Sequence, residues 1–177
     1  PTAGSAGVVP GVLSALIDKY QLSKKQQIEY LFVASGFGLV VANNASISGA
    51  MGGCQAEIGS ASAMAAAATV DVLGGTPEMA AHAFAMVIKN ILGLVCDPVA
   101  GLVEVPCVKR NALGSSLAIL SADMALAGIE SRIPADDAIQ AMDEVGKAMP
   151  SMYKETAEGG LAATPTARLL EKEVFLD

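Results

Sequence analysis

Apolar and polar positions recur along this chain with the period of an α-helix. The clearest case follows Pro134, where Asp136 and Asp137 open a segment whose apolar residues fall on one helical stripe. That stripe consists of Ile139, Met142, Val145, Met149 and Met152. It predicts an amphipathic helix that packs one face on a core and ends at Gly159 and Gly160.

Helix start and stop signals divide the rest of the chain into further helices. Ser23 with Gln26 three residues later is a capping-box pattern, and Thr76 followed by Pro77 is a second start signal. Gly74 marks the end of the helix before Thr76. The further helices that we expect are Val12–Tyr20, Ser23–Val41, Gln55–Leu73, Thr76–Leu92, Asn111–Ile129 and one within the terminal "TPTARLLEKEVF".

Segments rich in glycine and proline separate these helices. Pro1–Pro10 is expected to be a loop, and Asn43–Gly53 and Gly93–Cys107 are expected to be ordered loops. No internal repeat or low-complexity linker divides the 177 residues. The predicted fold class is therefore all-α, with residues 1–177 forming a single helical domain whose two ordered Gly/Pro-rich loops bear the cysteines.

The composition favours helices that pack closely and excludes some partners. Hydrophobic residues make up 53% of the chain, yet only 4% are aromatic and Trp is absent. The net charge of −7 argues against binding to nucleic acid or to an anionic membrane surface. The longest apolar run, Leu31–Ala42, is shorter than the roughly 20 residues that span a bilayer and predicts a core helix.

The chain contains three cysteines: Cys54, Cys96 and Cys107. An odd number, without a recognisable leader, argues against a disulfide framework and indicates a reducing compartment, so we expect a cytoplasmic protein. Each cysteine alone could simply fill space in an apolar core. However, each lies in or beside an expected loop and next to Gly or Pro, and Cys54 precedes a helix start, where a thiolate is stabilised.

Three thiolates that converge would suit a metal, and several readings stay open. A Cys₃His zinc site would need His82, which is expected in the middle of a helix. A [4Fe–4S] cluster would have one iron without a protein thiolate, and that iron could act as a Lewis acid. An electron carrier would need a fourth cysteine. A purely structural or interaction module made of helices would need none of the three.

Four segments of the sequence carry a family resemblance over nearly the whole chain. They are "PTAGSAGVVPGVL", "NNASISGAMGGCQAEIGSASAMAAA", "CDPVAGLVEVPCVKRNA" and "ETAEGGLAATPT". They resemble the α chain, or catalytic domain, of the bacterial iron–sulfur-dependent L-serine dehydratases.

This resemblance implies an activity, a cofactor and partners. It implies an all-helical catalytic domain that converts L-serine to pyruvate and ammonia with a [4Fe–4S] cluster and without pyridoxal phosphate. By the same resemblance Cys54, Cys96 and Cys107 are the cluster ligands. The family's α region extends upstream of "PTAG", and a β chain or β domain completes the enzyme, so we expect part of a longer α chain, in an oligomer.

Candidates for substrate binding and proton transfer lie near these motifs. Thr2, Gly4 and Ser5 could bind the substrate carboxylate, or belong to a simple linker. Glu57 could transfer a proton, or its negative charge could simply interact favourably with the dipole at the start of its helix. A second group, which could orient the substrate amine or simply cap a helix and fix a turn, consists of Asn43, Asn44, Ser46 and Ser48.

The residues beside the second and third cysteines have ordinary structural explanations. Lys109 and Arg110 could supply positive charge to a cluster or a carboxylate, although solvated residues at a helix start are the commoner case. Asp97 is expected to form an Asx-turn rather than to take part in chemistry.

Overall fold

A computed structural model describes residues 1–175 of the chain. Within this range the protein is helical, with no β-strand and one isolated β-bridge between Cys96 and Lys154. The α-helices are α1 (Val8–Tyr20), α2 (Lys24–Asn44), α3 (Gly49–Gly52), α4 (Cys54–Val72), α5 (Pro77–Asn90), α6 (Cys107–Leu126), α7 (Ala135–Ala148) and α8 (Pro165–Phe175). The short 3-10 helices are η1 (Ala3–Gly7), η2 (Val99–Gly101), η3 (Ser151–Tyr153) and η4 (Gly160–Ala163). The all-α prediction is confirmed.

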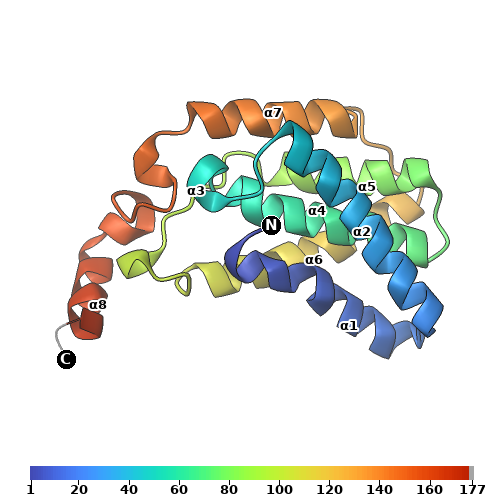
Figure 1. The fold of residues 1–177 in the computed structure, drawn as a ribbon, viewed down its shortest axis with the longest axis horizontal. Helices are drawn as coiled ribbons and strands as arrows, with labels where there is room; N and C mark the ends of the chain where they lie inside the picture. Colours follow the sequence, from blue (N-terminus) through green and yellow to red (C-terminus); the bar gives the residue numbers. More distant parts are fainter. Residues whose placement is uncertain (176–177) are drawn as a thin grey trace.

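Helix α4 forms the centre of the fold. It packs against α1, α2, α5, α6 and α7, which surround it, while α8 projects from one end of the molecule (Figure 1). Every residue from Cys54 to Ala63 and from Ala65 to Val70 is buried. Because most of these side chains are Ala, Ser or Gly, the neighbouring helices can approach the axis of α4 on all sides.

The capping signals in the sequence operate as expected. Ser23 and Gln26 form a complete capping box at the start of α2, and the Thr76 hydroxyl accepts a hydrogen bond from the Met79 amide at the start of α5. These bonds satisfy amides that a helix start leaves without intrahelical partners.

Three segments expected to be loops contain helix. The first helix begins at Val8, because Pro10 is tolerated in its first turn, where no intrahelical donor is needed. The segment after Asn44 contains α3, although we expected Asn43–Gly53 to be irregular. Helix α6 begins directly after Pro106, so Cys107 is helical.

The helix expected to end at Gly159 ends earlier. Helix α7 stops at Ala148, and Met149 has an extended backbone (φ −65°, ψ 129°). Pro150 explains this end, because the residue before a proline is disfavoured in the helical region. Met149 and Met152 therefore do not continue the apolar stripe of α7.

The apolar run Leu31–Ala42 lies in α2, but only one side of this helix is in the core. Tyr30, Ala34 and Val41 are buried, whereas Phe32 and Leu39 are exposed. The expectation of a core helix is therefore only half met. In the described part of the chain, no helix combines the length and apolarity that crossing a bilayer requires.

Candidate metal centre

The three cysteines lie at the ends of the two central helices and in the loop between α5 and α6. Cys54 is the first residue of α4, Cys107 is the first residue of α6, and Cys96 lies between them in sequence. All three are buried: 2% of the surface of Cys54 is exposed, 3% of that of Cys96 and 5% of that of Cys107. Since α4 and α6 pack side by side, thiols from distant parts of the chain lie in the same region of the fold, where Cys107 is affected by the charge of Cys54.

The thiols of Cys54 and Cys96 interact directly. The hydrogen bond from Cys96 lowers the pKa of Cys54, and the positive charge of Arg110 acts in the same direction against the effect of burial. The same hydrogen bond, together with burial, raises the pKa of Cys96. Burial raises the pKa of Cys107 to about 11, with a contribution from Cys54. Cys54 is therefore the first of the three to become a thiolate.

Arg110 brings a fixed positive charge to this group. Burial would lower its pKa, but its hydrogen bond to Asp97 raises it above the ordinary value. Its Nη1 donates to Asp97 Oδ1 at 2.6 Å and to the Val95 carbonyl oxygen at 3.0 Å, and the guanidinium also donates to Cys54. The ion pair is well shielded, because the side chain of Asp97 is only 3% exposed.

Asp97 also connects the cysteine loop to the C-terminal part of the chain. Its Oδ2 accepts a hydrogen bond from the Leu161 amide at 2.7 Å. A second connection pairs the Cys96 amide with the Tyr153 carbonyl oxygen and the Glu155 amide with the Cys96 carbonyl oxygen, both at 2.8 Å. Asp97 thus has a structural role, as expected, but it joins distant segments rather than forming a local turn.

Glu57 lies one turn after Cys54 and faces Cys96. Its carboxylate accepts a hydrogen bond from the Gly49 amide at 3.1 Å and another from the Thr2 hydroxyl. Burial raises the pKa of Glu57, although the Gly49 bond opposes this shift. A Cβ at Gly49 would lie 2.7 Å from Glu57 Oε2 and 2.9 Å from Cys96 Sγ, so only glycine fits where the carboxylate and the sulfur converge.

One set of possible ligand atoms in the described residues is close enough to hold a single ion. One atom each of Glu57, Cys96 and Glu155 lies within 4.8 Å of the others. Within residues 1–175 the three cysteine sulfurs do not form such a close set. Around one tetrahedral zinc, thiolate sulfurs lie about 3.8 Å apart, so the cysteines are too widely spaced for a mononuclear site.

The N-terminal segment packs beside α6. A Cβ at Gly4 would lie 2.8 Å from Asn111 Nδ2, so the backbone of η1 touches this amide. Asn111 Oδ1 is buried and has no hydrogen-bond partner in the described structure. Ser5 is fully buried and donates to the Thr2 carbonyl oxygen at 2.6 Å, so its hydroxyl is already engaged.

The side chains of the other candidates make local hydrogen bonds. Asn43 and Asn44 are exposed and donate to the Leu39 and Val40 carbonyl oxygens of their own helix, at 2.9 and 2.7 Å. The Ser46 hydroxyl accepts from the Ser48 amide at 3.2 Å and fixes a turn. His82 Nδ1 accepts from the Ser131 amide, and it lies beside Thr76 at the start of α5. The structure therefore does not bring His82 to the cysteines as a fourth ligand.

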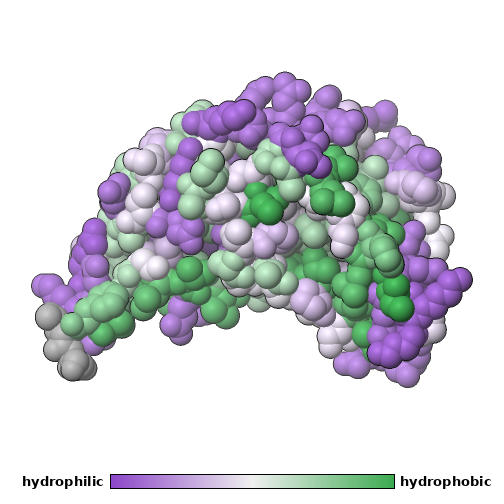
Figure 2. Space-filling view, in the orientation of Figure 1, coloured by the Kyte–Doolittle hydropathy of each residue, from purple (hydrophilic) through white to green (hydrophobic). Residues whose placement is uncertain are grey.

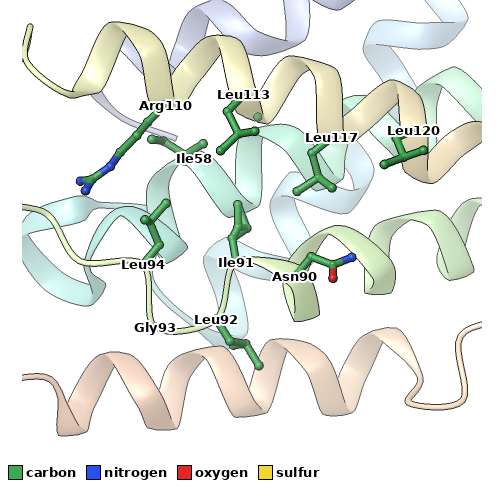
Figure 3. Close-up of a pocket in the computed structure, with 11 residues that line it drawn as sticks. Ile58, Asn90, Ile91, Leu92, Gly93, Leu94, Arg110, Leu113, Leu117 and Leu120 are labelled. Atoms are coloured by element: carbon green, nitrogen blue, oxygen red, sulfur yellow. The ribbon is translucent and has the colours of Figure 1, made fainter.

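A groove of about 560 Å³ borders the centre on one side. Figure 3 shows Arg110 and Ile58 near one end and Leu120 at the other, with Leu113 and Leu117 lining the α6 wall. Ile58 also packs against Cys54 and Cys96. Since the lining is mostly apolar, the groove offers few partners to a small polar substrate.

Three site residues were missed or undervalued by the sequence reasoning. Arg110 is a partly buried charge on the cysteines, not a solvated residue, whereas Lys109 is exposed. Asn111 lies one helical turn after Cys107, and that spacing could have indicated it. Glu155 approaches Cys96 only because of the fold, and no local pattern marks it.

Comparisons with known proteins agree on one family. The sequence profile described as "Serine dehydratase alpha chain" matches residues 1–162. Proteins named "Probable L-serine dehydratase, alpha chain" from Bacillus subtilis and Latilactobacillus sakei are 66% and 61% identical over 99% of this chain. The "L-serine dehydratase, alpha chain" of Peptoniphilus asaccharolyticus is 50% identical over 98% of it. The chain spans 58%, 84% and 59% of these three relatives, respectively.

Proposed function

Because the chain belongs to the serine dehydratase alpha chain family, we propose that it is the catalytic part of an L-serine dehydratase. The reaction removes water from L-serine and yields pyruvate and ammonia. The proposed cofactor is a [4Fe–4S] cluster held by Cys54, Cys96 and Cys107. The observation that carries the proposal is the direct interaction of the buried Cys54 and Cys96 thiols beside one fixed guanidinium, with the buried Cys107 thiol near enough for the charge of Cys54 to raise its pKa.

The donor set suits a cluster better than a single ion. Thiolates are the usual ligands of iron–sulfur clusters. The cysteine sulfurs are spaced more widely than one zinc ion would allow, and three thiolates leave one iron of four without a protein sulfur. When bound, such a cluster supplies a Lewis acid for the hydroxyl group that leaves the substrate.

The surrounding charges favour an anionic cofactor. Two long helices, α4 and α6, begin at Cys54 and Cys107, and the positive ends of their dipoles point to the same region. Arg110 adds a full positive charge, which Asp97 and the Val95 carbonyl oxygen hold in place. Arg110 lowers the pKa of Cys54 and opposes the rise in the pKa of Cys107 that burial causes.

Glu57 is the proposed proton-transfer residue on this chain. Dehydration requires loss of the α-proton and departure of the β-hydroxyl as water, and the enamine that results tautomerises and hydrolyses. The carboxylate of Glu57 lies beside Cys96 and is oriented by the Gly49 amide and the Thr2 hydroxyl. Its buried position favours the protonated form, so its Oε atoms can hold a proton for the departing hydroxyl.

The N-terminal segment and α6 are the proposed walls of the substrate site. Thr2 and the backbone around Gly4 would face the substrate carboxylate, while Asn111 Oδ1 is an unused acceptor that suits an ammonium group. Asn43 and Asn44 are left out because they cap α2, and the Ser5 and Ser46 hydroxyls serve internal turns.

The proposal includes partners and a location. The relatives' names contain the words "alpha chain", which supports a β chain as the partner of this one. Three free cysteines are consistent with a reducing, cytoplasmic setting. The competing function is a helical interaction module that folds around unmodified thiols.

The test is an anaerobic assay for iron, acid-labile sulfide and pyruvate on the purified protein with its β chain. We expect roughly four irons and four sulfides per chain, because three cysteinates hold a cubane cluster. Replacing Cys54, Cys96 or Cys107 with Ser, one at a time, should remove most of the bound iron and abolish pyruvate formation. Lys109→Ala, an exposed neighbour of Arg110, is the matched control and should change neither.

Two results would contradict the proposal. Stoichiometric zinc without sulfide would exclude the cluster. Pyruvate formation that survives all three cysteine replacements would show that the thiols serve only the fold.

A further inference from the structure

We propose that the exposed face of α2 is an interface for a second copy of this chain, with the two α2 helices antiparallel about a twofold axis. This inference is independent of the chemistry proposed above and concerns assembly. It follows from the apolar surface of α2, from a glycine with open space above it, and from the charges at the two ends of the helix.

The outer face of α2 is apolar where a solvated helix would be polar. Phe32 is 74% exposed, Leu39 is 64% exposed and Ile28 is 53% exposed. These residues lie on the side opposite to the buried Tyr30 and Ala34. Figure 2 shows apolar surface over α2, between a hydrophilic region at the start of the helix and another over α7. Large contiguous apolar patches of this kind mark interaction sites.

Gly36 lies at the edge of this face and borders an apolar groove of about 360 Å³, whose other lining residues are Val33, Phe37, Val40, Asp71, Pro77 and Ala80. It lies in the interior of α2, where glycine is unfavourable relative to alanine. A Cβ at Gly36 would have no atom within 4 Å, whereas a Cβ at Gly38, two residues on, would lie 2.8 Å from Met64 Cε. The space above Gly36 is therefore open in the monomer, and a residue without a side chain there suits the close approach of another helix.

Phe32 and Leu39, the two most exposed apolar residues of this face, are arranged symmetrically about the middle of the helix. Ser35 and Gly36 form the centre, with Phe32 three residues before it and Leu39 three residues after it. In an antiparallel pair the residues before the centre face those after it. Phe32 would then pack on the partner's Leu39, and Gly36 would lie beside the partner's Ser35. A self-complementary surface of this kind is what a twofold interface requires.

The charges at the ends of α2 favour the antiparallel orientation. Lys24 and Lys25 are exposed at its start. At its other end a groove of about 480 Å³ is lined by Val40, Asn44, Asp136, Ile139, Gln140 and Asp143. Lys25 pairs with Glu29 of its own helix at 3.6 Å, and Asp143 pairs with Lys147 of α7 at 2.5 Å. Antiparallel pairing brings Lys25 of each chain toward the groove of the other, where it can exchange Glu29 for Asp136 or Asp143, whereas parallel pairing would bring the lysines together. The contact also offsets part of the repulsion between two chains of net charge −7.

Sedimentation velocity of the purified protein tests the interface. We expect twice the mass of the single assembly at concentrations of about 10 µM and above. Gly36→Leu and Phe32→Asp should each weaken the association about tenfold or more, because both obstruct the centre of the patch. Gly11→Leu is the matched control: Gly11 is also an exposed helical glycine with nothing near its Cβ, but it lies on α1. It should associate like the unmodified protein.

Cross-linking tests the register. Under mild oxidation the double variant Phe32→Cys/Leu39→Cys should form a disulfide-linked dimer, and Phe32→Cys alone should form far less. Lys25→Glu, or a rise in salt concentration, should weaken the association because it removes the charge contact.

Three outcomes would overturn the proposal. The first is a protein that stays a single assembly at about 100 µM. The second is self-linking of Phe32→Cys alone, which indicates parallel helices. The third is a Gly36→Leu variant that no longer binds the β chain but still associates with a second copy of itself. That result would assign the face to the β chain.

Discussion

At the scale of single residues, Gly49 controls how closely a carboxylate and a sulfur approach. Its amide donates to Glu57, and its missing side chain leaves room for Cys96. No other residue type would leave that space, because even a single Cβ would lie under 3.0 Å from both groups. The glycine is thus part of the proposed centre although it offers no ligand atom.

We therefore expect Gly49→Ala to displace Glu57 and Cys96. The overpacked side chain should cost about 1–3 kcal/mol of the free energy of unfolding. Anaerobic iron content should fall with it, because the Cys96 sulfur must move. Thermal unfolding and iron analysis measure the two effects. Gly11→Ala, in open space on α1, is the control and should be neutral or stabilising. Normal iron content in Gly49→Ala would show that the sulfur position is not set by this contact.

At the scale of elements, Gln55 joins three segments around the start of α4. Its Nε2 donates to the carbonyl oxygens of Gly52 in α3 and of Met142 in α7, each at 3.0 Å. Its Oε1 accepts from the Gly93 amide at 2.9 Å. Gln55 is only 1% exposed, so water cannot easily replace its side chain as the hydrogen-bond partner of these backbone groups.

Replacing Gln55 with Leu should therefore destabilise the protein by about 3 kcal/mol, since two carbonyl groups and one amide lose a buried partner. Chemical denaturation followed by circular dichroism measures this. The control is Gln140→Leu, whose side chain is exposed and bonds only Glu144. A change in the Gln140 variant as large as that in Gln55→Leu would mean that the buried hydrogen bonds are not the cause.

The sequence predicted those elements whose ends carry local signals. Ser23 and Thr76 start helices where expected, because caps act within one turn. The end of α7 was wrong, since Pro150 outweighs the apolar spacing that continues to Met152. Glu155 and the inward turn of Arg110 were out of reach of local patterns, since both depend on contacts between distant segments.

At the scale of the whole molecule, the cysteines lie outside the main hydrophobic core, which is formed by other residues. Helix α4 is buried along nearly all its length, and most of its buried side chains are alanine or other small residues. Only its first residue, Cys54, contributes a thiol to the candidate metal centre. The core continues through α1, α2, α5, α6 and α7. A metal bound at the end of α4 would therefore add to an existing fold rather than create one.

Removing iron with a chelator should consequently leave the helical circular dichroism within about 10% of its starting value. In a zinc finger the fold depends on the bound metal, whereas here the core packs without the cysteines. Hydrogen exchange of α4 amides should stay slow, while that of the Val95–Asp97 segment should rise. Collapse of the far-ultraviolet signal on chelation would contradict this view.

The single carboxylate of Asp97 has a consequence far from its own loop. By accepting hydrogen bonds from Arg110 on one side and from the Leu161 amide on the other, it ties the chain around Leu161 to the proposed cofactor site. If the proposed cluster is bound, proteolytic cleavage between Ala148 and Leu161 should bleach its colour before the helices unfold.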